Sequence, residues 1–148
     1  INELLIRLLH RGDPHPEVFE RYSRVLGDLA TGGEVQPLLR LFERDLLEAV
    51  GYGLTLGHEY GSGKALEGSA MYDYRPGQGP VRLGGENQRS SRAISGNALL
   101  ALLSGQLDAV HLPQLRRLMR RVIGYHVGDK PLASQALFLG LKKKEPGE

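Results

Sequence analysis

The sequence predicts a mainly α protein, a helical domain with a small irregular β insertion. Apolar residues recur every three or four positions over the first fifty residues and again from residue 95 onward, which is the spacing of amphipathic helices. Residues 51–95 lose this period and hold 10 of the 20 glycines. A composition of 41% hydrophobic and 24% charged residues is typical of a globular chain, and 148 residues can form one packed core.

Three helices are expected before residue 51. The first runs from Ile1 to the Gly-Asp-Pro break at residues 12–14. The second begins near Pro16, because proline suits the first helical turn, and ends at residues 32–33. The third begins near Pro37 and ends at Gly51, where glycine can take the left-handed conformation of a helix end. Their apolar stripes are Ile1, Leu4, Leu5, Leu8 and Leu9, then Val18, Phe19, Tyr22, Val25, Leu26 and Leu29, and then Leu38, Leu39, Phe42, Leu46 and Val50.

Residues 51–94 predict an inserted β and loop subdomain with little core of its own. Residues 71–74 and 81–83 are short strand candidates, and the Pro- and Gly-rich residues 75–80 predict a turn between them. Residues 84–94 are expected to be mobile.

Helical structure returns after the insertion. Ser95 is a plausible N-cap of a helix that continues to Leu103, and a further helix begins near Pro113 and ends at Gly128. Ser134 is expected to cap a last short helix. These elements predict a helical domain over residues 1–50 and 95–141, the inserted subdomain over 51–94, and a basic tail over 142–148.

Composition excludes several classes of protein. The chain has no Cys, so it can form neither a disulfide framework nor a thiolate metal site. No apolar run reaches the roughly 18 residues of a membrane span. Aromatic residues make up 6% and Trp is absent, which argues against a base-stacking platform. The chain starts at Ile1 inside a helical pattern, as expected of a piece of a longer protein.

Motifs for catalysis are weak or missing. The Gly-Ser-Gly-Lys run at residues 61–64 falls short of a phosphate-binding loop, because His58 stands at the first motif position and Ala65 at the last. A flexible hairpin turn is the better interpretation. The five histidines share no metal-ligand spacing, and no serine lies in a Gly-x-Ser-x-Gly elbow. We therefore expect neither an enzyme nor a cofactor.

Charge is distributed unevenly along the chain. Residues 1–48 carry 6 basic and 9 acidic side chains, a net charge of −3, whereas residues 113–148 carry 8 and 3, a net charge of +5. Four arginines lie at helical positions i, i+1, i+4 and i+5 and form one band, which suits capture of phosphates or carboxylates. The alternative is that they pair with acidic residues of 1–48. The band consists of Arg116, Arg117, Arg120 and Arg121.

Three stretches of the chain are informative together. The first is Ile-Asn-Glu-Leu-Leu at residues 1–5. The second is Leu-Arg-Leu-Phe-Glu at 39–43, followed by Leu-Leu-Glu-Ala-Val-Gly-Tyr-Gly at 46–53. The third is Gly-Asp-Lys-Pro-Leu-Ala-Ser at 128–134, followed by Leu137 and Phe138. In this order and spacing they resemble the C-terminal part of the bacterial recombination mediators of the RecO family, and the resemblance covers essentially the whole chain.

This resemblance implies a function and a set of partners. Such proteins have an N-terminal OB-fold that binds DNA, followed by a helical domain with an inserted subdomain, and this chain corresponds to the helical domain alone. They anneal strands, recognise the acidic C-terminal tail of the single-stranded DNA-binding protein SSB, and load RecA together with RecR. The implied partners are single- and double-stranded DNA, the SSB tail and RecR, in the bacterial cytoplasm and on the nucleoid. Many relatives hold zinc through four Cys in the insertion, which this chain lacks, so we expect no zinc.

The resemblance also implies site residues. An arginine just before the Phe-Glu pair holds the SSB tail in such proteins and matches Arg40, with Leu39 and Phe42 as pocket walls. For DNA, the candidates are Arg116, Arg117, Arg120, Arg121, Lys142, Lys143 and Lys144, all expected to contact phosphates. Two rivals stay open at this point, a helical protein-interaction domain without a nucleic-acid role and, on residues 61–64 alone, an enzyme.

Overall fold

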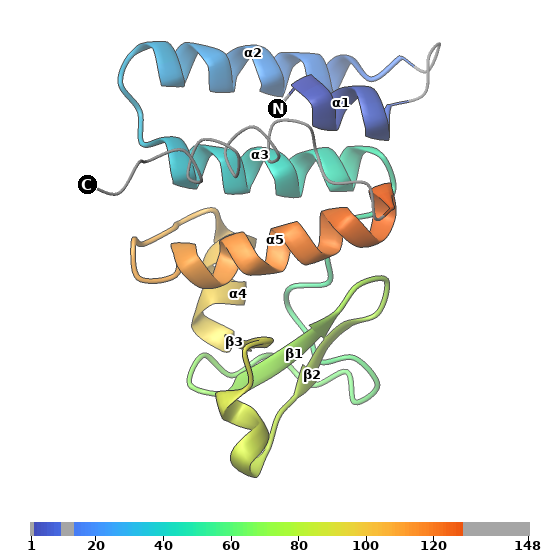
Figure 1. Cartoon of the computed structure of the whole chain (residues 1–148), viewed down its shortest axis with the longest axis vertical. Coiled ribbons are helices and arrows are strands. Elements are labelled where there is room, and N and C mark those ends of the chain that lie inside the picture. Colours follow the sequence, from blue (N-terminus) through green and yellow to red (C-terminus); the bar gives the residue numbers. More distant parts are fainter. Residues whose placement is uncertain (1, 10–13, 129–148) are drawn as a thin grey trace, which may run out of the picture.

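The computed structural model describes residues 2–9 and 14–128 and confirms the mainly α class with a small β insertion (Figure 1). Helix α3 lies between α2 and α5, and the sheet lies at the end of the molecule away from α2. The helices are α1 (Asn2–Leu8), α2 (Pro16–Ala30), α3 (Val35–Ala49), α4 (Gly96–Ser104) and α5 (Leu112–Val127). The strands are β1 (Met71–Arg75), β2 (Gly79–Arg82) and β3 (Ala93–Ser95), and a 3-10 turn, η1, spans Gly85–Arg89.

The first three helices lie close to their predicted positions, although Phe19 and Leu26 of the predicted α2 stripe are exposed. Helix α2 begins at Pro16, and α3 begins two residues before Pro37, which lies in its first turn. The inward stripes of α2 and α3 meet in the core, where the rings of Tyr22 and Phe42 pack with centroids 6.3 Å apart. Gly51 follows the end of α3 with φ +85°, as predicted for a helix end.

The sheet is antiparallel with the strand order β2-β1-β3. Strands β1 and β2 occupy the predicted positions, and Gln78 donates a backbone hydrogen bond to the Arg75 carbonyl oxygen (3.0 Å) in the turn between them. In the register, Tyr72 lies opposite Arg82 on one side and opposite Ile94 on the other. Strand β1 is therefore the central strand, and its Tyr72 and Tyr74 side chains are buried.

Residues 84–94, which we expected to be mobile, hold regular structure that the sequence did not predict. They contain η1 and most of β3, and the Ile94 side chain is only 2% exposed. The pattern failed here because β3 is three residues long, too short to show alternation, and its partner β1 lies about twenty residues earlier in the chain.

The predicted N-cap of α4 is confirmed, and it also joins the helix to the sheet. Ser95 is the last residue of β3, and its hydroxyl oxygen accepts a hydrogen bond from the Ala98 backbone nitrogen (3.2 Å). The Ser95 backbone nitrogen donates to Oε1 of Gln114 on α5 (2.8 Å). At the other end of α4, the Arg44 guanidinium donates to the Leu102 carbonyl oxygen (2.6 Å) and satisfies a helix-end acceptor.

One hydrophobic core runs from the helices into the insertion. Leu99, Leu102 and Met119 are fully buried, and Tyr72 of β1 is equally buried in the same cluster. The insertion therefore shares the core of the helices. Its contributions to the cluster are Leu56, Leu66, Tyr72, Tyr74 and Ile94.

The predicted helix after Ser134 and the basic tail at 142–148, with Lys142, Lys143 and Lys144, lie outside the described residues. None of the helices in the described part of the chain is long and apolar enough to cross a membrane.

Candidate functional site

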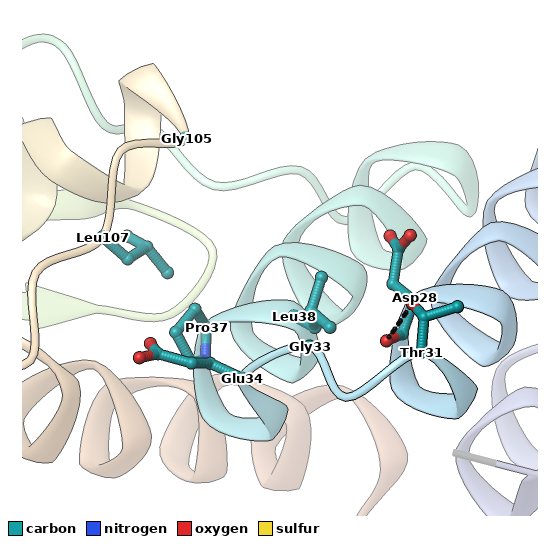
Figure 2. Close-up of a pocket in the computed structure, with 8 residues that line it drawn as sticks. All are labelled: Asp28, Thr31, Gly33, Glu34, Pro37, Leu38, Gly105 and Leu107. Carbon is teal, nitrogen blue, oxygen red and sulfur yellow. Dashed lines mark hydrogen bonds between the residues drawn. The ribbon is translucent and has the colours of Figure 1, made fainter.

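A pocket of about 370 Å³ opens where the turn between α2 and α3 faces the end of α4 (Figure 2). Its polar side chains include Asp28 and Glu34, and Leu38 and Leu107 supply apolar surface. Two carboxylates give this pocket the wrong charge for a phosphate or an acidic peptide.

A second, larger groove of about 530 Å³ lies between the start of α3 and the outer side of α5. Helix α5 turns a stripe of large apolar side chains into the core, which leaves Arg116, Arg117 and Arg120 exposed. We call this the arginine groove. It is lined by Gln36, Ala109, Leu112, Pro113, Arg116, Arg117 and Arg120.

The chemistry of the arginine groove is that of an anion site with an apolar floor. Leu112 and Pro113 lie at the start of α5, and Arg116 and Arg120 follow at intervals of one helical turn. Within the described residues, Arg116, Arg117 and Arg120 form no ion pair, so their predicted pairing with acidic residues of 1–48 is not seen there.

Arg40 lies one helical turn after Gln36 on α3. It adds a mostly buried positive charge that interacts with the groove residues Arg116 and Arg120. Its side chain is 9% exposed, and Nη2 donates to Oε1 of Glu43 (2.9 Å). Burial lowers the pKa of Arg40; Glu43 raises it, and the positive charges of Arg116 and Arg120 lower it. A guanidinium keeps its proton under such conditions. Three arginines from two helices thus converge, with one carboxylate near them.

That carboxylate is itself unusual. Burial raises the pKa of Glu43 to about 7, against the opposing effect of the Arg40 guanidinium. No sequence pattern indicated this burial, since Glu43 stands in an ordinary run of helix charges. Only the packing of α3 against its neighbours removes it from water.

The other predicted residues of the SSB-tail site have different positions. Leu39 is half-buried on α3. Phe42 is 2% exposed and packs against Tyr22 of α2. Its ring therefore lies in the core between α2 and α3 and has almost no surface exposed to a ligand. The apolar surface of the arginine groove comes instead from Leu112 and Pro113, neither of which was predicted to be a site residue.

Arg121 does not belong to the surface band, in contrast with its three neighbours. Its Nη2 donates to the Tyr74 carbonyl oxygen (2.7 Å) and lies 3.7 Å from Oδ1 of Asp73. Arg92 also approaches this carboxylate, at 3.7 Å. Burial lowers the pKa of Arg121, while Asp73 raises it. Arg121 therefore ties α5 to β1 of the insertion.

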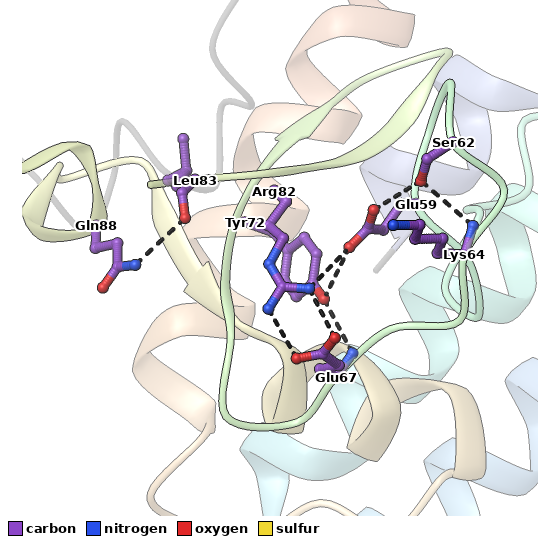
Figure 3. A network of polar contacts seen from close by, with 8 residues as sticks. All are labelled: Glu59, Ser62, Lys64, Glu67, Tyr72, Arg82, Leu83 and Gln88. Atoms are coloured by element: carbon purple, nitrogen blue, oxygen red, sulfur yellow. Dashed lines mark hydrogen bonds and ion pairs between the residues drawn. The ribbon is translucent and has the colours of Figure 1, made fainter. Parts of the chain in front are cut away.

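The insertion does not fit a zinc ion in the manner of a four-cysteine site. Its polar side chains bind one another, as Figure 3 shows. Glu59 accepts a hydrogen bond from Ser62 (2.7 Å) and one from the Tyr72 hydroxyl (3.4 Å), while Arg82 binds both oxygens of Glu67 (2.8 and 2.7 Å). Across the described residues, no group of three or more His, Cys, Asp or Glu is placed to hold a metal. We derive no metal chemistry here.

The Gly-Ser-Gly-Lys run forms a tight turn, as predicted. His58 and Ala65 form an isolated antiparallel bridge, and the Glu59 backbone nitrogen donates to the Lys64 carbonyl oxygen (2.8 Å). Gly61 has φ +87°, which requires glycine. No strand precedes the turn over residues 51–57, whereas a phosphate-binding loop follows one.

Comparison with known proteins agrees with this picture. A family described as "Recombination protein O C terminal" matches residues 1–136. The chain is 41% identical to the DNA repair protein RecO of Nitrosospira multiformis over 93% of its length and 57% of that protein. It is 42% identical to the DNA repair protein RecO of Nitrosococcus oceani over 97% of its length and 58% of that protein. It is 43% identical to the protein of the same name from Methylococcus capsulatus over 93% of its length and 56% of that protein.

The chain therefore spans somewhat more than half the length of the curated relatives that it matches. The match to the family covers all the helices and strands described above, from α1 to α5. The chain belongs to the RecO family and corresponds to its C-terminal part.

Proposed function

We propose that this chain is the helical part of a DNA repair and recombination mediator. It binds DNA and the acidic C-terminal tail of SSB, and with RecR it promotes strand annealing and RecA loading in the bacterial cytoplasm, on the nucleoid. The role is one of binding, without catalysis. The names of the relatives support the repair role, and the helical organisation proposed from the sequence, with an insertion over 51–94, is compatible with it.

The observation that carries the SSB-tail proposal is the convergence of Arg40, Arg116 and Arg120 beside Leu112 and Pro113. An acidic tail that ends in an aromatic residue and a free carboxylate needs fixed cations next to an apolar surface. Arginine suits carboxylates because its planar guanidinium can donate two parallel hydrogen bonds. The arginine groove offers both properties in one place.

Reversal of the charge of Arg40 tests this site. We expect Arg40→Glu to weaken binding of an acidic SSB-tail peptide by about 30-fold or more, because loss of a desolvated charge pair costs about 2 kcal/mol or more. Fluorescence titration of a labelled peptide measures the affinity. Arg116→Glu is the matched exposed variant, since Arg40 is buried and its replacement also perturbs Glu43.

The control for both variants is Arg24→Glu, an exposed charge reversal on α2 that does not line the groove. It should leave the peptide affinity unchanged. Wild-type affinity in folded Arg40→Glu and Arg116→Glu proteins, as checked by circular dichroism, would exclude the groove as the tail site.

For DNA, the exposed members of the arginine band are the candidates. We expect the double variant Arg117→Glu/Arg120→Glu to bind a single-stranded oligonucleotide more weakly and with a flatter salt dependence. Each lost phosphate contact reduces the slope of log affinity against log salt by about 0.7 on single strands, so two contacts reduce it by roughly 1.4. Anisotropy titrations at several salt concentrations measure the slope.

The matched control is Arg24→Glu/Arg89→Glu, which reverses two exposed arginines outside the groove. Equal slopes for the wild type and the groove variant would show that DNA lies elsewhere. Arg121 is a poor choice for this test, because its contacts with Tyr74 and Asp73 make its loss a structural change.

One observation favours the alternative, a helical protein-interaction domain without a direct nucleic-acid role. The acidic pocket of Figure 2 has the wrong charge for DNA, and Phe19 and Leu26 expose apolar surface on α2. Filter binding of DNA at low and at moderate salt separates the two functions. A nucleic-acid binder retains DNA at low salt and releases it as salt rises, whereas the alternative retains none.

A further inference from the structure

The contact between Arg40 and Glu43 leaves one buried polar atom of each side chain without a hydrogen-bond partner among the described residues. Nη2 of Arg40 donates to Oε1 of Glu43 at 2.9 Å. Arg40 Nε and Glu43 Oε2 are both buried, and neither has a hydrogen-bond partner among the described residues. Buried polar atoms are normally paired, because an unpaired one loses its hydration without compensation. The pair is therefore incompletely satisfied and open to exchange.

The groups that face this pair are mostly positive. Arg116 and Arg120 of α5 act on Arg40 through their positive charges. His111, at the start of α5 and next to the groove, has a buried Nδ1 without a partner in the described residues. Among the described residues, Glu43 is thus the carboxylate that binds Arg40, on the same helix as the groove residue Gln36.

We propose that Glu43 competes with an incoming acidic peptide for the Arg40 guanidinium. A carboxylate of an incoming acidic peptide takes the place of the Glu43 carboxylate on the Arg40 guanidinium, and Glu43 takes up one proton from solvent at the oxygen that it leaves free. Capture of the peptide is thereby coupled to protonation of Glu43. This inference rests on the proposed SSB-tail site and adds its regulation.

The sign of the effect follows from the electrostatics. A second negative charge beside Glu43 disfavours its ionised form, so a bound peptide raises the pKa of Glu43 further above the value of about 7 in the free protein. The peptide should therefore bind more tightly as the pH falls. If only the protonated form accepts the peptide, its affinity rises about tenfold between about pH 8 and pH 6. The carboxylates of the peptide do not titrate in this range.

The experiment is calorimetric titration with a synthetic acidic peptide that ends in phenylalanine, in buffers of different ionisation enthalpy. We expect the wild type to bind about tenfold more tightly near pH 6 than near pH 8, with uptake of a proton that the buffer dependence of the heat reveals. Glu43→Gln keeps the shape of the side chain without the charge. It should bind near pH 8 about as tightly as the wild type does near pH 6, with less proton uptake.

Two control variants isolate Glu43. Glu48→Gln removes an exposed carboxylate of the same helix and should keep the wild-type pH dependence. His111→Gln removes the histidine at the start of α5, next to the groove, and it too should keep most of the dependence. If Glu43→Gln is poorly folded by circular dichroism, proton uptake by the wild type and by His111→Gln still decides the matter.

The outcomes separate this inference from the proposed function. Pronounced pH dependence in folded Glu43→Gln, or its loss in His111→Gln, overturns the role of Glu43 while peptide binding itself stands. Absence of proton uptake by the wild type does the same. Failure of the wild type to bind the peptide at either pH overturns the tail site, and with it the role of Glu43.

Discussion

Replacement of Tyr72 by alanine is expected to lower the free energy of unfolding by about 4 kcal/mol, the usual effect of removing a buried aromatic ring. The Tyr72 side chain is fully buried at the centre of the sheet, in the core that the insertion shares with the helices. A chain of this size should then melt roughly 8–16 °C lower. Differential scanning calorimetry of the variant measures both quantities.

Tyr72→Phe is the matched control, because it keeps the ring and removes only the hydroxyl. That hydroxyl accepts a hydrogen bond from the Glu67 backbone nitrogen (2.9 Å) and contacts Glu59 (3.4 Å). Its loss should cost about 1 kcal/mol. A Tyr72→Ala protein that melts within a degree or two of Tyr72→Phe would contradict the buried position of the ring.

Gly96→Ala is expected to destabilise the fold by about 3 kcal/mol, although alanine is normally the better helix residue. A Cβ at the start of α4 would overlap the backbone carbonyl oxygen of Glu67. The two backbones cannot separate easily, because Gly96 donates to the Ala70 carbonyl oxygen (2.8 Å) and Asn97 to that of Gly68 (2.9 Å). Chemical denaturation measures the loss.

The same substitution at Gly124 of α5 provides the control. Among the described residues, nothing beyond the neighbouring residues and backbone of α5 lies within 4 Å of a Cβ at this position, and the residue lies inside the helix. Gly124→Ala should therefore stabilise the protein by about 0.5–1 kcal/mol. Equal effects of the two substitutions would rule out the close contact between α4 and the chain at Glu67.

Periodicity was sufficient for the helices and not for the elements that depend on distant partners. The apolar stripes of α2, α3 and α5 stand at regular intervals, so their positions followed from the sequence. Strand β3 has three residues and exists because Ile94 pairs with Tyr72. No local pattern reports such a pairing, and the same is true of the contact at Gly96.

The candidate site shows the same division between local and tertiary information. Arg40 and the arginine band entered the sequence analysis as two separate sites, and the packing of α3 against α5 brings Arg40 next to Arg116 and Arg120. Its spacing in the sequence placed Arg121 in the arginine band, but its hydrogen bond to Tyr74 of β1 holds it away from the exposed arginines. A sequence pattern shows on which face of a helix a residue lies, but it does not show which other element packs against that face.

The junction at Ser95 has a mechanical consequence. This residue ends β3 and caps α4, so no linker separates the last strand from the helix that follows. A hinge absorbs a change of backbone angle at loop or element-terminal residues, and here the backbone nitrogens of Ser95 and Gly96 are both held by hydrogen bonds. The sheet is therefore tied directly to α4, and α5 holds this junction through Gln114 and Arg121 while the same helix carries the groove arginines.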